Sequence, residues 1–410
     1  MSRARQAWTI FGALVAGYTL SMFFRSANGT IGPELMRDLG LGAEALATLT
    51  SAFFITFAVS QIPAGMLLDR FGPRRVMAAV MLLNAVGAMW FALGQGLTEL
   101  TLARVVLGLG CSCSLVGSMV VFSRWMPPER FATMVSLLIA IGTAGNALST
   151  TPLAWVAAQW GWREAFIGMA GAAVAAAALL GLMVRDSPPG AAAPGGGSES
   201  LAEVLAGVGK VLRERQLHHV FAVNFFSYAS TIAVLGLWGG PYLNDVHRVD
   251  AVTRGNLLLA MVGASILGYL AMGPLDRIFN TRKFIVVPGA AATVALFLIL
   301  AAIPGLSLVA AVSLLVAICF VSSYVVAVLA HGRAIFPPEL VGRGVTTLNV
   351  ATMGGAAFVQ FLTGLVVGAM TPAGQAIPEI AYRAAFGAVG GCLLLGLLIY
   401  LPVKDIRPRP

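Results

Sequence analysis

Charged residues are scarce in this sequence. They make up 10% of its 410 residues, against about 25% in an ordinary soluble protein. Hydrophobic residues make up 58%, and the mean hydropathy is +0.87. The length alone would suit two or three soluble domains, but this composition excludes a water-soluble globule. We therefore expect a polytopic membrane protein.

Cysteine is also rare, and its placement excludes several kinds of site. The four cysteines lie in apolar segments without the Cys-x-x-Cys spacing of metal or redox sites, so we expect them to pack in the core: Cys111, Cys113, Cys319 and Cys392. No Ser-His-Asp order, nucleotide-binding glycine loop or metal-ligand cluster appears at useful spacing, which argues against an enzyme and against a cofactor or metal. The net charge of +9 sits in short loops, so it indicates membrane topology and not a nucleic-acid partner.

Long apolar runs, in contrast, are abundant. Crossing the hydrocarbon core takes about 20 mostly apolar residues, and about twelve such segments are present. They cover approximately residues 8–33, 45–68, 76–94, 100–121, 131–157, 165–184, 219–242, 257–275, 284–303, 306–330, 345–370 and 384–403. The sequence predicts an all-α protein with twelve transmembrane helices.

The basic residues predict the orientation of these helices. If the N-terminus is cytoplasmic, 19 Lys and Arg residues lie on the cytoplasmic side and 5 on the opposite side, where Arg248 and Arg254 occupy the loop before the eighth segment. Arg25 and Arg104 remain inside the membrane. We expect both termini to be cytoplasmic, in the plasma membrane or bacterial inner membrane, with the lipid bilayer as the surrounding partner.

A break in composition divides the chain after the sixth segment. Residues 185–198 are rich in Pro, Gly and Ser, and residues 201–214 place apolar side chains at helical spacing among charged ones. We interpret the second stretch as an amphipathic linker helix, with a docking site for a partner as the alternative. The expected parts are a six-helix bundle at 1–184, a cytoplasmic linker at 185–217 and a second six-helix bundle at 218–410.

Two loop motifs recur in the two parts. Gly65 to Arg75 follows the second segment, and a similar stretch from Gly273 to Lys283 follows the eighth. A Pro-Pro-Glu motif likewise precedes the fifth and the eleventh segments, and both motifs repeat at an offset of about 207 to 210 residues. The two bundles should therefore be pseudo-symmetric, a design common in transporters.

The first of these motifs resembles the signature loop of the major facilitator superfamily, and the resemblance covers nearly the whole chain. It implies a transporter in which this loop gates the cytoplasmic face, with an Asp that pairs with nearby arginines and with a helix N-terminus of the other half. The alternative is an ordinary basic inner loop. The gating residues would be Gly65, Asp69, Arg70, Gly72, Arg74 and Arg75, with Asp276 and Arg277 in the second copy.

The two intramembrane arginines are the strongest functional signal. An Arg near the middle of a membrane helix costs at least about 2.5 to 3.5 kcal/mol on insertion scales, so it should face a cavity or a counter-charge. The acidic residues can all be placed in loops or near helix ends, Glu34 being the least certain, which leaves none to neutralise Arg25 or Arg104. An anionic substrate is the expected counter-charge, because guanidinium binds carboxylate or phosphate with two parallel hydrogen bonds.

Other polar residues accompany these arginines. Tyr18, Ser21, Arg25 and Asn28 share one face of the first helix, which should line the translocation path. The alternatives are that Arg25 snorkels to the outer interface and that Arg104 is an interfacial charge. Further candidates for substrate contact, which could instead bridge helices, are Asn224, Tyr228, Asn349 and Gln360.

Arg25 stands eight residues before Pro33, a spacing similar to that in anion:cation symporters and organophosphate:phosphate antiporters. The resemblance implies that Arg25 contacts the anionic group of the substrate. The carboxylates that symporters commonly carry are replaced here by Phe24 and Cys111, and the seventh segment lacks the basic residue of the antiporters. A monocarboxylate is thus favoured over a phosphate ester.

The sequence as a whole predicts a monomeric secondary transporter that carries a small organic anion by alternating access. Its coupling ion would be a proton or sodium. Two alternatives stay open at this point. One is proton-driven efflux of hydrophobic compounds, and the other is a transport-dead sensor or scaffold.

Overall fold

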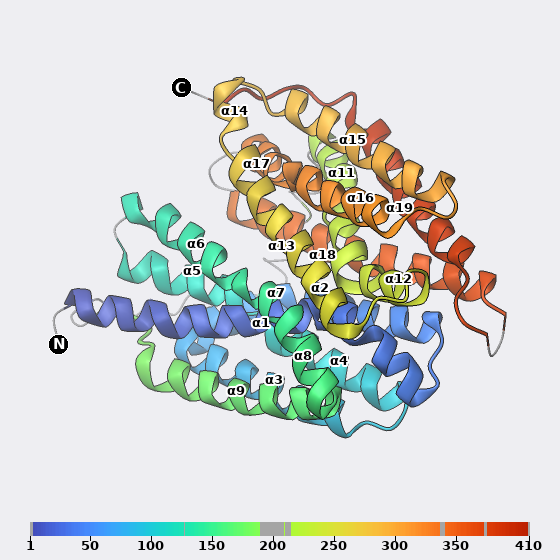
Figure 1. Ribbon diagram of the computed structural model, residues 1–410. Coiled ribbons are helices and arrows are strands. Elements are labelled where there is room, and N and C mark those ends of the chain that lie inside the picture. The colour runs from blue at the N-terminus through green and yellow to red at the C-terminus, as the bar shows by residue number, and fades with distance from the viewer. Residues whose placement is uncertain are drawn as a thin grey trace.

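The protein is helical throughout the part of the chain that the structure describes. The computed structural model describes residues 3–126, 128–188, 209, 215–336, 341–372 and 375–408 (Figure 1). Twelve helices within these ranges are long and apolar enough to cross a membrane. The expected fold class is confirmed. The expected linker helix and parts of the two Pro-Pro-Glu motifs lie outside the described residues, so the three domain boundaries stay a prediction.

The first six spans are built from nine helices. Each of the first three spans is a single helix: α1 (Arg3–Leu39), α2 (Ala43–Phe71) and α3 (Pro73–Leu93). The fourth span contains α4 (Leu97–Cys111) and α5 (Ser114–Trp125), and the fifth contains α6 (Pro128–Gly142), α7 (Ala144–Leu148) and α8 (Thr151–Trp160). The sixth is α9 (Trp162–Met183).

The second six spans also include whole and broken helices, but the broken ones lie in part at other positions than in the first six. The seventh joins α11 (Arg215–Ala233), the π-helix η1 (Val234–Trp238) and α12 (Gly239–Asp245), and the eighth joins α13 (Ala251–Met272) and α14 (Leu275–Ile278). The ninth is α15 (Lys283–Ala302), and the tenth joins α16 (Leu308–Val321), the 3₁₀ turn η2 (Ser322–Tyr324) and α17 (Val325–Ile335). The last two are α18 (Val341–Met370) and α19 (Glu379–Tyr400).

The first helix is longer than the sequence suggests. It was expected to end near Pro33 but continues to Leu39, with Pro33 inside it. Proline has no N–H, so the carbonyl of Gly29 loses its partner within the helix. The second half packs closely at that point: a Cβ added to Gly240 would lie 1.9 Å from the Gly29 oxygen. Only glycine allows this approach of the two backbones.

The two halves meet at one end of the molecule. A Cβ added to Gly364 of α18 would lie 2.1 Å from Cβ of Ala47 in α2, and the hydroxyl of Thr151 in α8 donates to Oδ1 of Asn256 in α13 at 2.9 Å. Each of these residues lies toward the end of its span that is remote from the N- and C-termini of the chain. Figure 1 shows the halves converging there and parting toward the ends of the chain. The structure is therefore closed on the side remote from the termini.

Each half also returns a carboxylate to the start of its third helix. Oδ1 of Asp186, just after α9, accepts the backbone N–H of Arg74 at 2.7 Å. Oδ1 of Asp405, just after α19, accepts the backbone N–H groups of Arg282 and Lys283, each at 3.0 Å. Free N–H groups at a helix start favour such an anion. These equivalent caps support the predicted pseudo-symmetry.

Candidate functional site

Arg25 lies in the middle of α1 where the two halves meet. Arg25 is 7% exposed, which excludes snorkelling to the interface. Nη1 donates to the hydroxyl of Tyr228 in α11 at 3.3 Å, and the guanidinium carbon lies 4.9 Å from the centroid of the Phe57 ring. Nε is buried without a partner in the part of the chain described here. Among the described residues, the guanidinium of Arg25 contacts a neutral phenol and an aromatic face and forms no ion pair.

Three phenols from three helices interact electrostatically with this guanidinium, and Tyr228 also accepts its hydrogen bond. Tyr18 of α1, Tyr228 of α11 and Tyr269 of α13 all lie within electrostatic range of Arg25. Tyr18 and Tyr228 were predicted from the sequence, whereas Tyr269 and Phe57 were missed. Tyr269 is a polar group on an otherwise apolar span, which is the signal that could have identified it. The site combines one cation with hydroxyl donors and aromatic walls.

Arg104, the other predicted arginine, is held differently. It is fully buried, so it does not reach the interface. Nη1 donates to the backbone carbonyl of Phe24 at 2.9 Å, and Nε donates to that of Leu49 at 3.4 Å. Its guanidinium carbon also lies 4.5 Å from the centroid of the Phe53 ring. Arg104 therefore ties α4 to α1 and α2, and its role in substrate binding stays a prediction.

The predicted amides differ in their surroundings. Nδ2 of Asn28 donates to the Thr50 hydroxyl at 3.2 Å, and Nδ2 of Asn224 donates to the Leu348 carbonyl at 2.8 Å. These two bridge neighbouring helices, while Asn349 is half-buried. Gln360 is fully buried, and neither atom of its amide has a partner among the described residues.

The predicted gating loop is open to solvent. Asp69 is exposed, and its carboxylate forms no hydrogen bond or ion pair with any residue that the structure describes. Nε of Arg74 instead donates to the Gly181 carbonyl at 2.6 Å, within the first half. In the second copy, Asp276 lies 3.6 Å from Nε of Arg282. The expected latch of Asp69 to the other half is not formed in this conformation, as the parted halves require.

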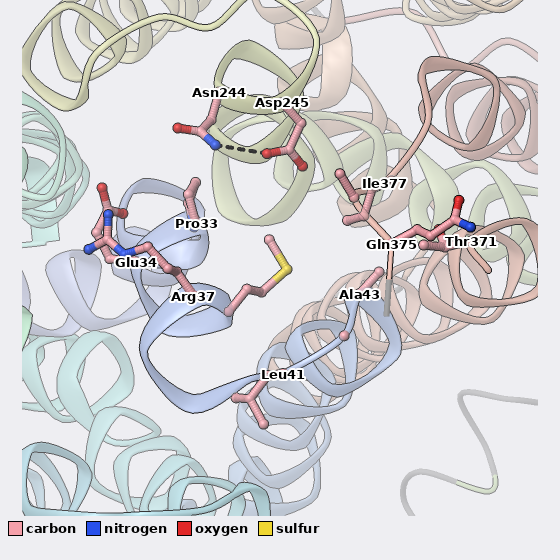
Figure 2. A pocket seen from close by; sticks show the side chains of 13 residues that line it. Pro33, Glu34, Arg37, Leu41, Ala43, Asn244, Asp245, Thr371, Gln375 and Ile377 are labelled. Carbon is pink, nitrogen blue, oxygen red and sulfur yellow. Dashed lines mark hydrogen bonds between the residues drawn. The ribbon is translucent and has the colours of Figure 1, made fainter. Parts of the chain in front are cut away.

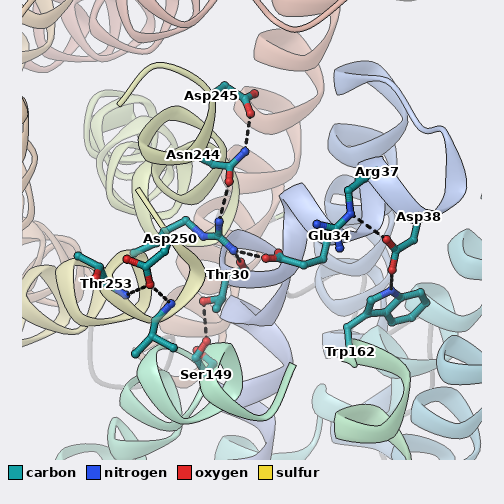
Figure 3. A network of polar contacts seen from close by, with 12 residues as sticks. Thr30, Glu34, Arg37, Asp38, Ser149, Trp162, Asn244, Asp245, Asp250 and Thr253 are labelled. Carbon is teal, nitrogen blue, oxygen red and sulfur yellow. Dashed lines mark hydrogen bonds and ion pairs between the residues drawn. The ribbon is translucent and has the colours of Figure 1, made fainter. Parts of the chain in front are cut away.

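Arg254 is a third buried arginine, and its position differs from the one expected. Arg254 was assigned to a loop, but it lies inside α13 and is 2% exposed. Its Nη2 pairs with Oε1 of Glu34 in α1 at 2.5 Å, and its Nη1 donates to Oδ1 of Asn244 at 3.0 Å (Figure 3). The loop assignment was wrong because α13 begins earlier than expected. Asp250 caps its polar first turn, and Arg254 lies at the end of that turn. The ion pair joins the two halves at their closed end.

A pocket of about 410 Å³ adjoins this ion pair (Figure 2). Glu34 and Arg37 of α1 line one side, and Asn244 and Asp245 of α12 face them. The pocket carries both signs of charge, so it lacks the excess positive charge that would bind an anion. It is distinct from the surroundings of Arg25.

Comparison with known proteins now decides the family. A model of the Major Facilitator Superfamily matches residues 14–270. The chain belongs to the major facilitator superfamily. It is 24% identical over 297 residues to a protein of Cupriavidus necator named "Probable sulfoacetate transporter SauU", covering 68% of this chain and 67% of that protein. It is 25% identical over 269 residues to the "Probable galactarate/D-glucarate transporter GudP" of Escherichia coli, covering 61% and 58% of the two chains.

Solved structures show the same fold at lower identity. The chain matches the nucleoside transporter NupG with a TM-score of 0.77 at 12% identity, covering 96% of this chain and 99% of that one. It matches a bacterial homologue of the human lysosomal transporter Spinster, solved in an inward-facing and occupied conformation, with a TM-score of 0.75 at 16% identity. That match covers 96% of each chain. These structures confirm the major facilitator fold, and the family and the twelve apolar helices indicate an integral membrane protein.

Proposed function

We propose that this protein is a secondary transporter of a small organic anion, a carboxylate, with Arg25 as the residue that holds the anionic group. One observation carries the proposal. Arg25 is buried between the two halves, and no carboxylate lies within ion-pair distance of it among the described residues. A buried charge without a counter-charge is costly, so a binding partner of opposite sign is expected there.

The surroundings of Arg25 suit a carboxylate. Nη1 already donates to Tyr228, while Nε has no partner and can donate to an incoming oxygen. The phenols of Tyr18 and Tyr269 can donate to the same group. Because Arg25 belongs to α1 and Tyr228 to α11, a bound anion would contact both halves, which alternating access requires.

The relatives support the same class of cargo. The names of several refer to transport of organic acids: sulfoacetate, galactarate and D-glucarate, hexuronate and gallate. With the termini in the cytoplasm, as the distribution of basic residues predicts, the parted side of the molecule faces inward and the closed side faces outward. A bacterial inner membrane is the expected location.

Counterflow in proteoliposomes tests this proposal. Vesicles preloaded with one acid from a panel of carboxylates, sulfonates and phosphate esters are diluted into the same labelled acid, and wild-type protein should exchange at least one carboxylate. Arg25→Gln should abolish this exchange. The control on the same helix is Arg5→Gln, at an exposed position remote from the site. Equal exchange by Arg25→Gln and wild type would remove Arg25 from the mechanism, and exchange of a hydrophobic cation alone would favour efflux of hydrophobic compounds.

A further inference from the structure

Gln360 presents an unusual pair of buried polar atoms. The side chain is fully buried in α18, and both Oε1 and Nε2 lack a hydrogen-bond partner among the residues that the structure describes. Leaving a buried polar group without a hydrogen-bond partner is unfavourable. Buried polar groups are otherwise almost always paired. A side chain with two such atoms calls for a ligand or another partner.

This amide lies beside the Arg25 region of α1. A Cβ added to Gly236 would lie 3.6 Å from Nε2 of Gln360 and 3.9 Å from the backbone oxygen of Arg25. Gly236 belongs to the π-helix η1, and such helices occur mostly as single turns at functional sites. The irregular turn therefore has Gln360 on one side and the backbone of Arg25 on another.

Two more unsatisfied oxygens come from neighbouring helices. The close contact between Gly364 and Ala47 sets the register of α18 against α2, which run in opposite directions. One helical turn from that contact, Gln360 comes opposite Ser51. The Ser51 hydroxyl is buried without a partner in the described part of the chain, as is Oδ1 of Asn28, three residues after Arg25.

Bridging between helices does not account for Gln360. Asn224 of α11 fills that role by donating to Leu348 and Thr352 in α18, at 2.8 Å each. Closer to Gln360, the indole N–H of Trp238 donates to the Thr363 hydroxyl at 2.8 Å and joins η1 to α18. The contact between these elements thus already has its polar bridge, and the amide of Gln360 takes no part in it.

The chemistry of these atoms selects a neutral polar group. Gln360, Ser51 and Asn28 are uncharged, so a second anionic group would gain no ion pair from them. A primary amide both donates and accepts, as does a serine hydroxyl, which matches an alcohol that also donates and accepts. We propose that Gln360, with Ser51 and Asn28, forms a hydroxyl-binding subsite next to Arg25, and that the preferred cargo is a hydroxycarboxylate. This inference rests on the proposed function of Arg25.

Matched acids test the subsite in the same proteoliposomes. Exchange is measured for pairs that differ by one hydroxyl, lactate against propionate and glycerate against 3-hydroxypropionate. Wild-type protein should prefer the hydroxylated acid of a pair by about tenfold in KM, equivalent to 1.4 kcal/mol. Gln360→Met, which keeps the length of the side chain but removes both polar atoms, should reduce this ratio to about one while still exchanging the simpler acid. Gln360→Asn should restore part of the preference.

A control variant separates specificity from helix packing. Thr363→Val removes the partner of Trp238 on the same helix, so it should lower thermal stability but keep the preference for the hydroxylated acid. The subsite is refuted if Gln360→Met keeps the wild-type preference, or if wild-type protein exchanges carboxylates without any preference. Failure of wild-type protein to exchange any carboxylate would instead refute the proposed function itself.

Discussion

A buried arginine lies in the middle of α1 and another packs against its far end, and of the two only the second has a carboxylate partner among the described residues. Near the far end, Arg254 of the second half pairs with Glu34 and also donates to Asn244 and to the Thr30 carbonyl at 3.3 Å. In the middle, Arg25 contacts the Tyr228 hydroxyl and the face of Phe57, with no ion pair among the residues that the structure describes. A carboxylate of the protein neutralises the arginine where the halves are in fixed contact, whereas no carboxylate of the described residues pairs with the arginine where we place the cargo.

Giving Arg25 an internal carboxylate should have the largest effect on transport. Tyr228→Glu places an acid at the position of its hydrogen-bond acceptor, so the anionic cargo would be replaced by a side chain. We expect anion exchange to fall by at least about 100-fold, a change of about 2.7 kcal/mol. Tyr228→Phe is the matched variant that removes only the hydroxyl, and it should raise KM by a few fold. Normal exchange by Tyr228→Glu would show that the charge of Arg25 is not available to the cargo.

Removing the carboxylate from Arg254 tests the other side of the comparison. Glu34→Gln leaves Arg254 buried and unpaired, which should lower the free energy of unfolding by about 3 to 5 kcal/mol. Thermal unfolding in detergent measures this loss. The exposed Glu44 at the same end provides the control, because Glu44→Gln should change stability by less than about 0.5 kcal/mol. A double variant, Glu34→Gln with Arg254→Gln, should regain part of the loss, and equal stability of all these proteins would deny that the pair holds the halves together.

Arg104 extends the comparison to a third buried arginine. Because its bonds go to the backbone carbonyls of Phe24 and Leu49, we expect Arg104→Met to lower the free energy of unfolding by about 2 to 3 kcal/mol. The KM of anion exchange should change less than in Arg25→Lys. If Arg104→Met raised the KM of anion exchange strongly but left the free energy of unfolding unchanged, Arg104 would instead be assigned to binding of the cargo.

Asp405 lies on the side of the molecule opposite to the Arg254–Glu34 pair. Its replacement should have the smallest effect on stability, and this effect should depend on pH. Burial alone would raise the pKa of Asp405, but the backbone N–H groups of Lys283 and Arg282 and the Thr281 hydroxyl outweigh it, so its pKa lies below its ordinary value. The charged form therefore stabilises the fold above the unfolded pKa, near 3.9, and this contribution is lost as the pH falls through the folded pKa. Asp405→Asn should cost about 0.5 to 2 kcal/mol at pH 7 and progressively less at acid pH. A pH-independent difference would contradict the role of its charge.

The sequence predicted the features that depend on composition along a single helix. Apolar runs of membrane length gave the twelve spans, and a charge inside such a run identified Arg25. Tyr228 was found in the same way, as a polar group on an apolar span. The motif Asp69–Arg70 identified the family, which the match over residues 14–270 confirms.

Features that depend on contacts between helices could not be predicted. Backbone carbonyls on α1 and α2 hold Arg104, and such acceptors leave no trace in the sequence. The pairing of Arg254 with Glu34 joins residues 220 positions apart. The unsatisfied amide of Gln360 differs from the bonded amide of Asn224 only in its neighbours, so the sequence gives the two residues equal weight.

Anion binding to purified protein tests most directly whether the cargo supplies the counter-charge of Arg25. A carboxylate that the wild-type protein exchanges, added at about 100 times its Kd, should stabilise that protein against thermal unfolding by about 2.7 kcal/mol. Arg25→Gln should show no such stabilisation while remaining folded without the anion. Equal stabilisation of wild type and Arg25→Gln would contradict the account.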